Sequence, residues 1–190
     1  MDNAILLWIN HGWANPWLDA FFSWVSLRGG FGFPLAAVVL ALCAIRFGGD
    51  GVKLWLALVI TVGAADFTGN QIKHIAQQHR PCYDLADQVR QPGRPPHTPC
   101  GASLTGMPSN HATNFFAAAL FLAYTLRRRW VSLSMGFVAL SVALSRIYLG
   151  KHYPSQVGAG ILLGSTIGLV AAWTSVKYLA FIQRIRARSP

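Results

Sequence analysis

Acidic residues are scarce in this 190-residue chain, which has six of them, all aspartate, against sixteen lysines and arginines. Charged residues together make up 12% of the chain, against roughly 25% in soluble domains, while hydrophobic residues make up 53%. Such a composition cannot cover an aqueous surface, so it excludes an ordinary soluble protein and indicates a membrane protein. The length suits one domain, and we predict a single integral-membrane domain over residues 1–190.

Cysteine is also rare, and the few histidines and aspartates show no metal-ligand spacing, so we expect neither a metal ion nor another cofactor. The start of the chain lacks the basic segment and the small-residue cleavage site of a secretory signal. Cys82 and Cys100 fall in one loop, 18 positions apart. Two interpretations stay open for them: a disulfide, which would stabilise the loop by roughly 3 kcal/mol in an oxidising compartment, or two unrelated thiols.

Long apolar runs are abundant, and five of them can cross about 30 Å of hydrocarbon as helices, some only with their flanks. A sixth run, Ile5–Leu27, is rich in tryptophan but is interrupted at residues 11–16, so it is either a kinked span or an interfacial helix followed by a short helix. We predict an all-α, polytopic membrane helical bundle of about six helices, with residues 1–30 as its interfacial or kinked N-terminal segment. The five clear runs are Phe31–Phe47, Val52–Ile72, Ala112–Leu126, Trp130–Leu149 and Val157–Tyr178.

The basic residues divide between the two ends of these runs. If the helices alternate in direction, Arg46, Lys53, Arg127–Arg129 and a basic tail over residues 183–190 fall on one side, which the positive-inside rule makes cytoplasmic. A second set of cations falls on the opposite side, where an anionic substrate would explain it. We therefore expect a multi-pass protein of the cell (inner) membrane with its site on the periplasmic, extracytoplasmic side. The second set comprises Lys73, Arg80, Arg90, Arg94, Arg146 and Lys151.

Residues 82–108 form a proline-rich segment that we predict to be an extracytoplasmic loop, of the kind that covers or binds ligands. Within it, Arg90 and Arg94 either guide an anionic headgroup or are solvated loop charges. Just before it, Asp66, Lys73 and Arg80 recur every seven residues, a spacing that would place all three on one face of a helix ended by Pro81.

Two further segments carry polar chemistry at the edges of apolar runs. Ser109 or Asn110 is a suitable N-cap, and the helix N-terminus that it starts would be an anion site with His111 in its first turn. Between the last two runs, Arg146 and His152 lie six positions apart. A neutral imidazole beside fixed cations suits attack on a phosphate, whereas the alternative is a loop of snorkelling side chains at the membrane edge.

Together these segments resemble the three-part signature of the type 2 phosphatidic acid phosphatase (PAP2) family. The matching residues are Lys73-x6-Arg80-Pro81, Pro108-Ser109-Asn110-His111 and Ser145-Arg146-x5-His152, and the resemblance covers roughly residues 52–178. It implies a six-helix membrane bundle with an extracytoplasmic site, in which His152 is the nucleophile that forms a phosphohistidine and His111 is the general acid. The phosphate-binding residues that it implies are Lys73, Arg80, Ser109, Asn110 and Arg146.

Two positions depart from the pattern of that family. Asn110 stands where glycine is usual, a modest change because the backbone N–H is what this position presents. Gln156 stands where an aspartate usually accepts a hydrogen bond from the second ring nitrogen of the nucleophile. A glutamine carbonyl can still accept that bond but carries no charge, so we expect a rate about tenfold lower, unless another acceptor replaces it. We therefore include Gln156 among the catalytic candidates.

The function that these residues predict is metal-independent hydrolysis of a phosphomonoester or diphosphate on a membrane lipid. Polyprenyl diphosphate, phosphatidylglycerol phosphate, phosphatidic acid and lipid A are all compatible substrates. A lipid phosphotransferase would use the same first step, and a degenerate lipid-binding or transport protein is the non-enzymatic alternative. The expected partner is thus a phosphorylated lipid and not a nucleic acid, while the oligomeric state stays open.

Overall fold

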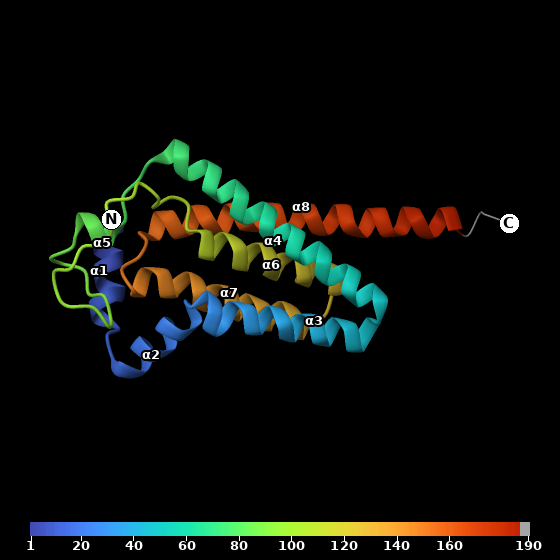
Figure 1. Ribbon diagram of the computed structural model, residues 1–190, viewed down its shortest axis with the longest axis horizontal. Coiled ribbons are helices and arrows are strands. Elements are labelled where there is room, and N and C mark those ends of the chain that lie inside the picture. Colours follow the sequence, from blue (N-terminus) through green and yellow to red (C-terminus); the bar gives the residue numbers. More distant parts are fainter. Residues whose placement is uncertain (187–190) are drawn as a thin grey trace.

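Five long helices lie side by side along the molecule and form a bundle (Figure 1). The computed structural model describes residues 1–186, apart from the side chains of residues 28–29 and 179–186. Residues 187–190, which end the predicted basic tail, lie outside the described residues. The all-α prediction is confirmed. The long helices are α3 (Phe33–Phe47), α4 (Gly49–Ala76), α6 (Asn110–Leu126), α7 (Arg129–Tyr148) and α8 (Pro154–Arg186).

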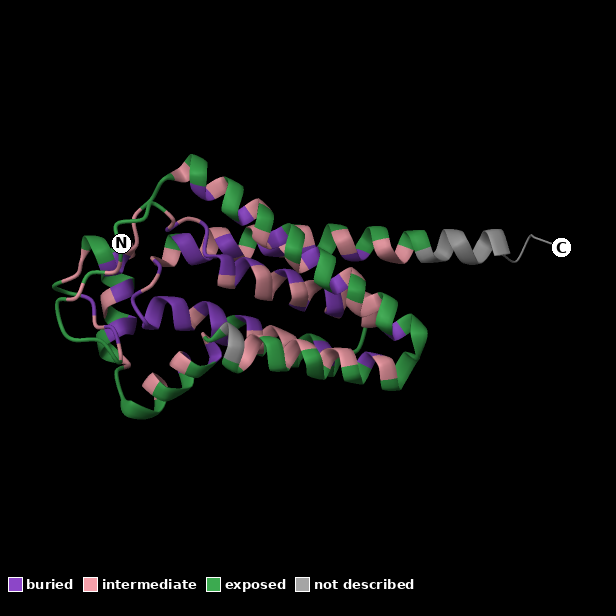
Figure 2. Cartoon of the chain, viewed as in Figure 1, coloured by how far each residue is buried: buried purple, intermediate pink, exposed green. Residues whose placement is uncertain are grey.

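The outer surface of the bundle is apolar, as a lipid-facing surface must be. Ile45, Ile60 and Leu162 are 84%, 72% and 72% exposed, and exposed residues run along the outward sides of the helices (Figure 2). Within the described residues, four helices are long and apolar enough to cross a membrane. These four candidate spans are Gly30–Phe47, Gly49–Ala76, Arg129–Tyr148 and Pro154–Tyr178.

Helix α6 lies inside the bundle, where it contacts α4, α7 and α8. Its closest neighbour is α8, and the reason is a row of glycines four residues apart. A Cβ atom at Gly160 would come within 2.6 Å of the Ser109 carbonyl, and one at Gly164 or Gly168 would collide with the carbonyl oxygens of Thr113 and Ala117. The small residues therefore let the backbones of α6 and α8 touch, which brings the beginnings of these two helices together.

The first apolar segment consists of two short helices, α1 (Asp2–Gly12) and α2 (Pro16–Val25), and not of one long span. The break is encoded locally, because Pro16 begins α2 and the Asn15 side chain caps it by accepting a hydrogen bond from the Leu18 N–H (2.9 Å). A π-helical turn, η1 (Arg28–Gly32), leads from α2 into α3, and α1 lies across one end of the bundle (Figure 1).

Helix α4 differs from its predicted form at both ends. It begins at Gly49, before the predicted start at residue 52, and it ends at Ala76 because Gln77 adopts a left-handed conformation. Arg80 therefore lies beyond the helix in extended backbone, and the prediction that it shares a helical face with Lys73 is wrong. The following loop contains one short helix, α5 (Pro81–Asp84), and a disulfide joins Cys82 to Cys100.

Candidate active site

A polar cavity of about 500 Å³ lies at the end of the bundle where the 77–108 segment meets α6, α7 and the turn before α8. It brings together Lys73, Arg80, His111, Arg146 and His152, which come from segments far apart in the chain. Five other residues complete its lining: Ser26, Leu27, Asn70, Thr105 and Asn110. The residues predicted to bind phosphate and to act in catalysis thus surround one space, except Ser109 and Gln156, which are buried and do not line it.

His152 is 3% exposed and is held in a defined orientation. Its backbone N–H donates to the Arg146 carbonyl (3.0 Å), and its Nδ1 lies 2.8 Å from the Gly106 carbonyl oxygen and 3.2 Å from Gln156 Oε1. Both of these partners can only accept, so we assign the ring proton to Nδ1 and the lone pair to Nε2.

Electrostatics keep this imidazole neutral. Burial lowers the pKa of His152 well below its usual range, and the nearby charges of Arg146, Arg80 and Lys73 lower it further, against a smaller opposing effect of the hydrogen bond to Gly106. A neutral ring, which keeps a lone pair on one nitrogen, is the form that can attack an electrophile.

Gln156 is 1% exposed and connects His152 to the segment that carries Arg80. Its Oε1 also accepts a hydrogen bond from the Tyr153 N–H (3.2 Å), while its Nε2 donates to the His79 carbonyl (2.8 Å) and to Gln78 Oε1 (3.3 Å). The sequence leaves two possibilities open: the amide keeps the orientation of the imidazole, or another acceptor replaces it. The structure contains both, since the Gly106 carbonyl is the shorter of the two contacts to Nδ1.

Three cations reach the cavity from different elements. Lys73, in the last turn of α4, donates to the Pro108 carbonyl, and Arg146, in the last turn of α7, donates to the Ser26 hydroxyl. Arg80 donates to Thr105 Oγ1 (3.2 Å), and burial lowers its pKa, although a guanidinium stays charged at neutral pH. The cavity is therefore suited to an anion with several oxygens, because hydrogen bonds from charged donors are the strong ones.

Ser109 is the N-cap residue of α6, but its side chain makes no capping hydrogen bond, which corrects one part of the predicted cap. The Ser109 N–H instead bonds to the Gln156 carbonyl (3.0 Å), so this residue joins the start of α6 to that of α8. The helix end has no side-chain cap, and its first residues, Asn110 and His111, line the cavity. The free N–H groups of a helix N-terminus favour an anion at such a place.

Asn110 does more than present its backbone. Its Nδ2 donates to Asp66 Oδ1 and to Asn70 Oδ1 (both 2.9 Å), and Asn114 Nδ2 donates to the same aspartate oxygen (2.9 Å). Residues 66 and 70 on α4 face residues 110 and 114 on α6, each pair being one helical turn apart. This network fixes α6 against α4, so Asp66 acts as a packing partner between helices.

Ser26, at the C-terminal end of α2, was not predicted and contacts two of the site residues. Its carbonyl oxygen lies 3.2 Å from His111 Nε2, and its hydroxyl accepts the hydrogen bond from Arg146. A carbonyl only accepts, so we assign a proton to this nitrogen of His111. No sequence motif marks Ser26, which lies 85 positions before His111.

The two loop arginines differ in position. Arg90 lies outside the lining of the cavity: its guanidinium bonds to Asp19 (2.8 Å) and stacks on the Tyr148 ring, and its N–H donates to the buried Asn10 side chain. It joins α1 and α2 to the loop, and both predicted roles are replaced by this structural one. Arg94 is exposed. Among the described residues, no three His, Cys, Asp or Glu side chains are grouped as metal ligands would be.

An apolar groove of about 400 Å³ runs between α3, α4, α6 and α7 and meets the polar cavity. The two spaces share Ser26, Leu27 and His111. The groove walls are aliphatic and aromatic side chains such as Val39, Leu58 and Phe115. A molecule with a polar head and a hydrocarbon tail would match this pair of spaces.

A multi-pass helical bundle whose end holds a neutral histidine among three cations defines a membrane protein with an oxyanion site. Residues 54–179 match the sequence profile of the PAP2 superfamily, and the chain belongs to this superfamily. It is 37% identical over 78 residues to the lipid A 4'-phosphatase of Bacteroides thetaiotaomicron, a match that covers 41% of this chain and 35% of that protein. It is also 34% identical over 117 residues to the decaprenylphosphoryl-5-phosphoribose phosphatase of Mycobacterium tuberculosis, with 58% of each chain covered.

These two matches span less than two thirds of the length of either relative. A longer match, 24% identical over 180 residues, joins 89% of this chain to 81% of phosphatidylglycerophosphatase B of Bacillus subtilis. Among solved structures, Aquifex aeolicus LpxE superposes with a TM-score of 0.70 at 22% identity, covering 90% of this chain and 93% of that one. The shared fold is therefore that of a transmembrane PAP2 protein, and this chain is a multi-pass membrane protein.

Proposed function

We propose that this protein is a membrane lipid phosphatase that releases phosphate from a lipid phosphomonoester or diphosphate through a phosphohistidine at His152. The observation that carries the proposal is the orientation of His152: its Nδ1 faces two carbonyl oxygens, so the lone pair on Nε2 is available beside Lys73, Arg80 and Arg146. Phosphoryl transfer depends chiefly on positioning and on stabilising negative charge on the equatorial oxygens, and these groups supply both.

In the first step, Nε2 of His152 attacks phosphorus and the bond from phosphorus to the lipid oxygen breaks. His111, as the imidazolium, gives its Nε2 proton to that leaving oxygen and becomes neutral. The leaving oxygen would lie where the Ser26 carbonyl oxygen contacts Nε2 in this structure. In the second step, His111 removes a proton from water, the water oxygen bonds to phosphorus, and the bond between phosphorus and nitrogen breaks. Inorganic phosphate leaves, and His152 is restored.

The substrate class follows from where the leaving oxygen would lie. His111 lines both the polar cavity and the apolar groove, so a leaving group next to His111 would extend its hydrocarbon chain into the groove. The names of the relatives fit a lipid substrate, because each pairs a phosphatase with a lipid: lipid A, a decaprenylphosphoryl sugar or phosphatidylglycerophosphate. Polyprenyl diphosphate and phosphatidic acid have the same combination of head and tail.

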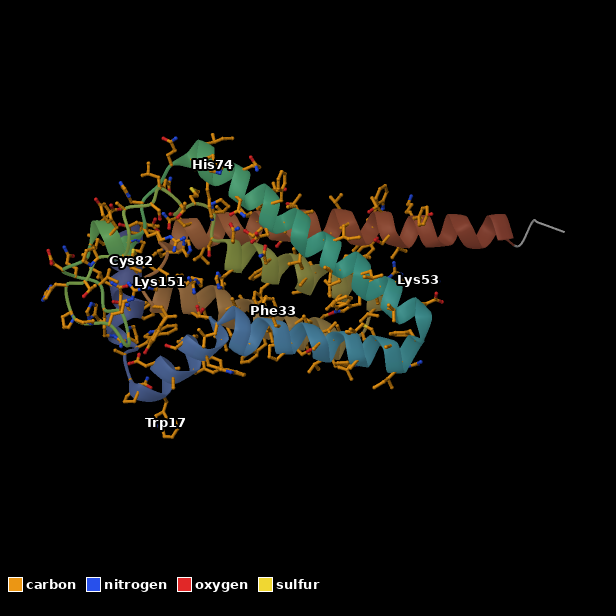
Figure 3. The ribbon with its side chains drawn as sticks, viewed as in Figure 1. Trp17, Phe33, Lys53, His74, Cys82 and Lys151 are labelled. Carbon is orange, nitrogen blue, oxygen red and sulfur yellow. A yellow bond between two sulfur atoms is a disulfide. The ribbon has the colours of Figure 1, made fainter. Side chains whose placement is uncertain are left out.

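We further infer that the site faces the periplasm or another extracytoplasmic space, with the bundle in the cell (inner) membrane and residues 1–190 acting as one domain. Lys53 lies at the opposite end of the bundle from Cys82 and Lys151 (Figure 3), and the Arg127–Arg129 cluster joins α6 to α7 at that far end. Excess positive charge favours the cytoplasmic side, and a disulfide at the site end favours an oxidising compartment.

The test is release of inorganic phosphate by the purified protein in detergent, from a panel of lipid A, phosphatidylglycerol phosphate, phosphatidic acid and polyprenyl phosphates. We expect His152→Ala to abolish release and His111→Ala to reduce it at least a hundredfold, the lower range for a general acid–base group. A chelator should leave the rate unchanged. Transfer of the phosphate to a second lipid would assign a phosphotransferase instead, and a wild-type protein without activity on the whole panel would refute the proposal.

A further inference from the structure

Ser26 lies where a lipid substrate would have to pass from one space to the other. The polar cavity and the apolar groove share three residues, Ser26, Leu27 and His111. A lipid with its phosphate in the cavity and its hydrocarbon chain in the groove would cross between the two spaces at these residues. The hydrogen bonds that Ser26 makes in this structure therefore stand across the path of the substrate.

Both of these bonds use groups that the proposed reaction needs. The Ser26 hydroxyl accepts a hydrogen bond from the Arg146 guanidinium, and the Ser26 carbonyl oxygen lies 3.2 Å from Nε2 of His111. In the reaction, the same guanidinium holds a phosphoryl oxygen and the same nitrogen protonates the leaving oxygen. The two oxygens of Ser26 thus stand in for two oxygens of the substrate, which has to displace both.

The segment that follows Ser26 has a backbone that can rearrange locally. Residues 28–32, with the sequence RGGFG, form the π-helical turn η1, a rare conformation that is frequent at functional sites. The Leu27 carbonyl accepts hydrogen bonds from two N–H groups of this turn, those of Phe31 (3.0 Å) and Gly32 (3.3 Å). Because three of the five residues are glycines, other backbone conformations of the turn are accessible at little steric cost.

The turn lies between a fixed helix and the wall of the groove. On α2, Phe22 and Val25 are buried, and the Phe22 ring packs on Tyr148 of α7, with 4.7 Å between the ring centroids. Within the turn, the Phe31 ring stacks on Phe115 of α6, with 6.1 Å between the centroids. Phe115 lines the groove, so a hydrocarbon chain there would meet the side chain against which the turn rests.

We propose that residues 26–32 form a strap that closes the site between substrates. A lipid phosphate opens the strap by displacing Ser26 from Arg146 and His111. A phosphate oxygen replaces the hydroxyl at Arg146 because a charged acceptor makes the stronger hydrogen bond to a charged donor. The proposal rests on the function given above and adds to it that the closed strap lowers the apparent affinity of the site for anions.

The first experiment titrates inorganic phosphate by calorimetry into wild type and Ser26→Ala in detergent. Alanine removes the oxygen that competes for Arg146, so phosphate should bind this variant roughly three- to tenfold more tightly than wild type. If Ser26 only held Arg146 in place for the substrate, the same variant would bind phosphate more weakly. Ser132→Ala is the matched control, because the Ser132 hydroxyl bonds to the Arg128 carbonyl at the far end of α7.

The second experiment makes the strap stiffer and predicts a shift of the opposite sign. Gly32 has helical backbone angles (φ −64°, ψ −48°), and a Cβ atom there would meet nothing within 4 Å, so alanine fits the closed strap and restricts the other conformations. Gly32→Ala should weaken phosphate binding by roughly two- to fivefold. Gly136→Ala on α7 also meets nothing within 4 Å and should leave phosphate binding unchanged.

Thermal unfolding of the same proteins separates these effects from misfolding, since neither glycine variant should have a lower melting temperature than wild type. Phosphate binding by Ser26→Ala that is equal to or weaker than that of wild type would overturn the strap. Equal binding by Gly32→Ala and wild type would overturn it as well. Because calorimetry needs no turnover, absence of lipid hydrolysis would count against the phosphatase function alone.

Discussion

The most informative perturbation of this site is Gln156→Leu, which removes one acceptor from His152 Nδ1–H and keeps the size of the side chain. If Gln156 were the sole acceptor, its loss would allow the ring proton to move from Nδ1 to Nε2, and the wrong tautomer lowers kcat by up to ~10⁴ in a comparable catalytic triad. The Gly106 carbonyl, however, lies closer to the same nitrogen, at 2.8 Å against 3.2 Å. The loss is then one neutral hydrogen bond of about 1 kcal/mol, so we expect kcat to fall by about tenfold or less.

The assay is phosphate release under single-turnover conditions, with thermal unfolding in detergent as the control for folding. Gln156→Leu should also lower stability by roughly 1 kcal/mol, because the partly buried His79 carbonyl loses its donor. Gln156→Asp tests the opposite change, because its carboxylate is a charged acceptor that favours the imidazolium-like phosphohistidine, and kcat should rise by about tenfold. This variant should also lose stability, because the His79 carbonyl again loses its donor. A fall of ~10³ or more in a folded leucine variant, or no gain in the aspartate variant, would refute this account of His152.

Three further outcomes follow from the geometry. The pKa of His152 in the folded state lies well below its unfolded value near 6.5, so its neutral form contributes stability above about pH 6.5 that is lost as the pH falls. His152→Ala removes this group, and the melting temperature of the variant should fall less than that of wild type between pH 7.5 and 5. Gly164→Ala should destabilise the protein because its Cβ atom would collide with the α6 backbone. Gly158→Ala on the same helix meets nothing within 4 Å and should stabilise the protein by roughly 0.5–1 kcal/mol. Equal melting temperatures of the two variants would contradict the close packing of α6 on α8. Asn110→Gly should lower the melting temperature by removing two hydrogen bonds to α4, and an unchanged value would show that this network is dispensable.

The long apolar helices and the residues that meet at the cavity are predictable from the sequence because their signals are local. A run of about twenty apolar residues forms a helix in a membrane, and the cations near His111 and His152 are recognisable because charged residues are rare in such apolar segments. The resemblance to the PAP2 family added the order of the motifs, and the matched profile over residues 54–179 confirms it.

Other features were beyond sequence reasoning because they depend on backbone groups or on distant contacts. The Gly106 carbonyl has no side chain to mark it, and the left-handed Gln77 that ends α4 before Arg80 has no glycine or proline as a signal. Ser26 reaches His111 only through the break that makes α2 a separate helix. The sequence leaves two roles open for Arg90, a headgroup contact or a solvated charge, and misses the structural one because the partner Asp19 lies 71 positions earlier in the chain.

The glycine row between α6 and α8 bears on how the protein would respond to the thickness of its membrane. Main-chain atoms have no alternative rotamers, so the offset between the two imidazole rings is set by rigid backbone surfaces in contact. A thicker or thinner bilayer can tilt helix α3, which contacts α4 and not α6, and so reshape the hydrocarbon groove without changing that offset. Lipid composition should therefore alter substrate affinity while leaving the intrinsic rate of the chemical step nearly constant.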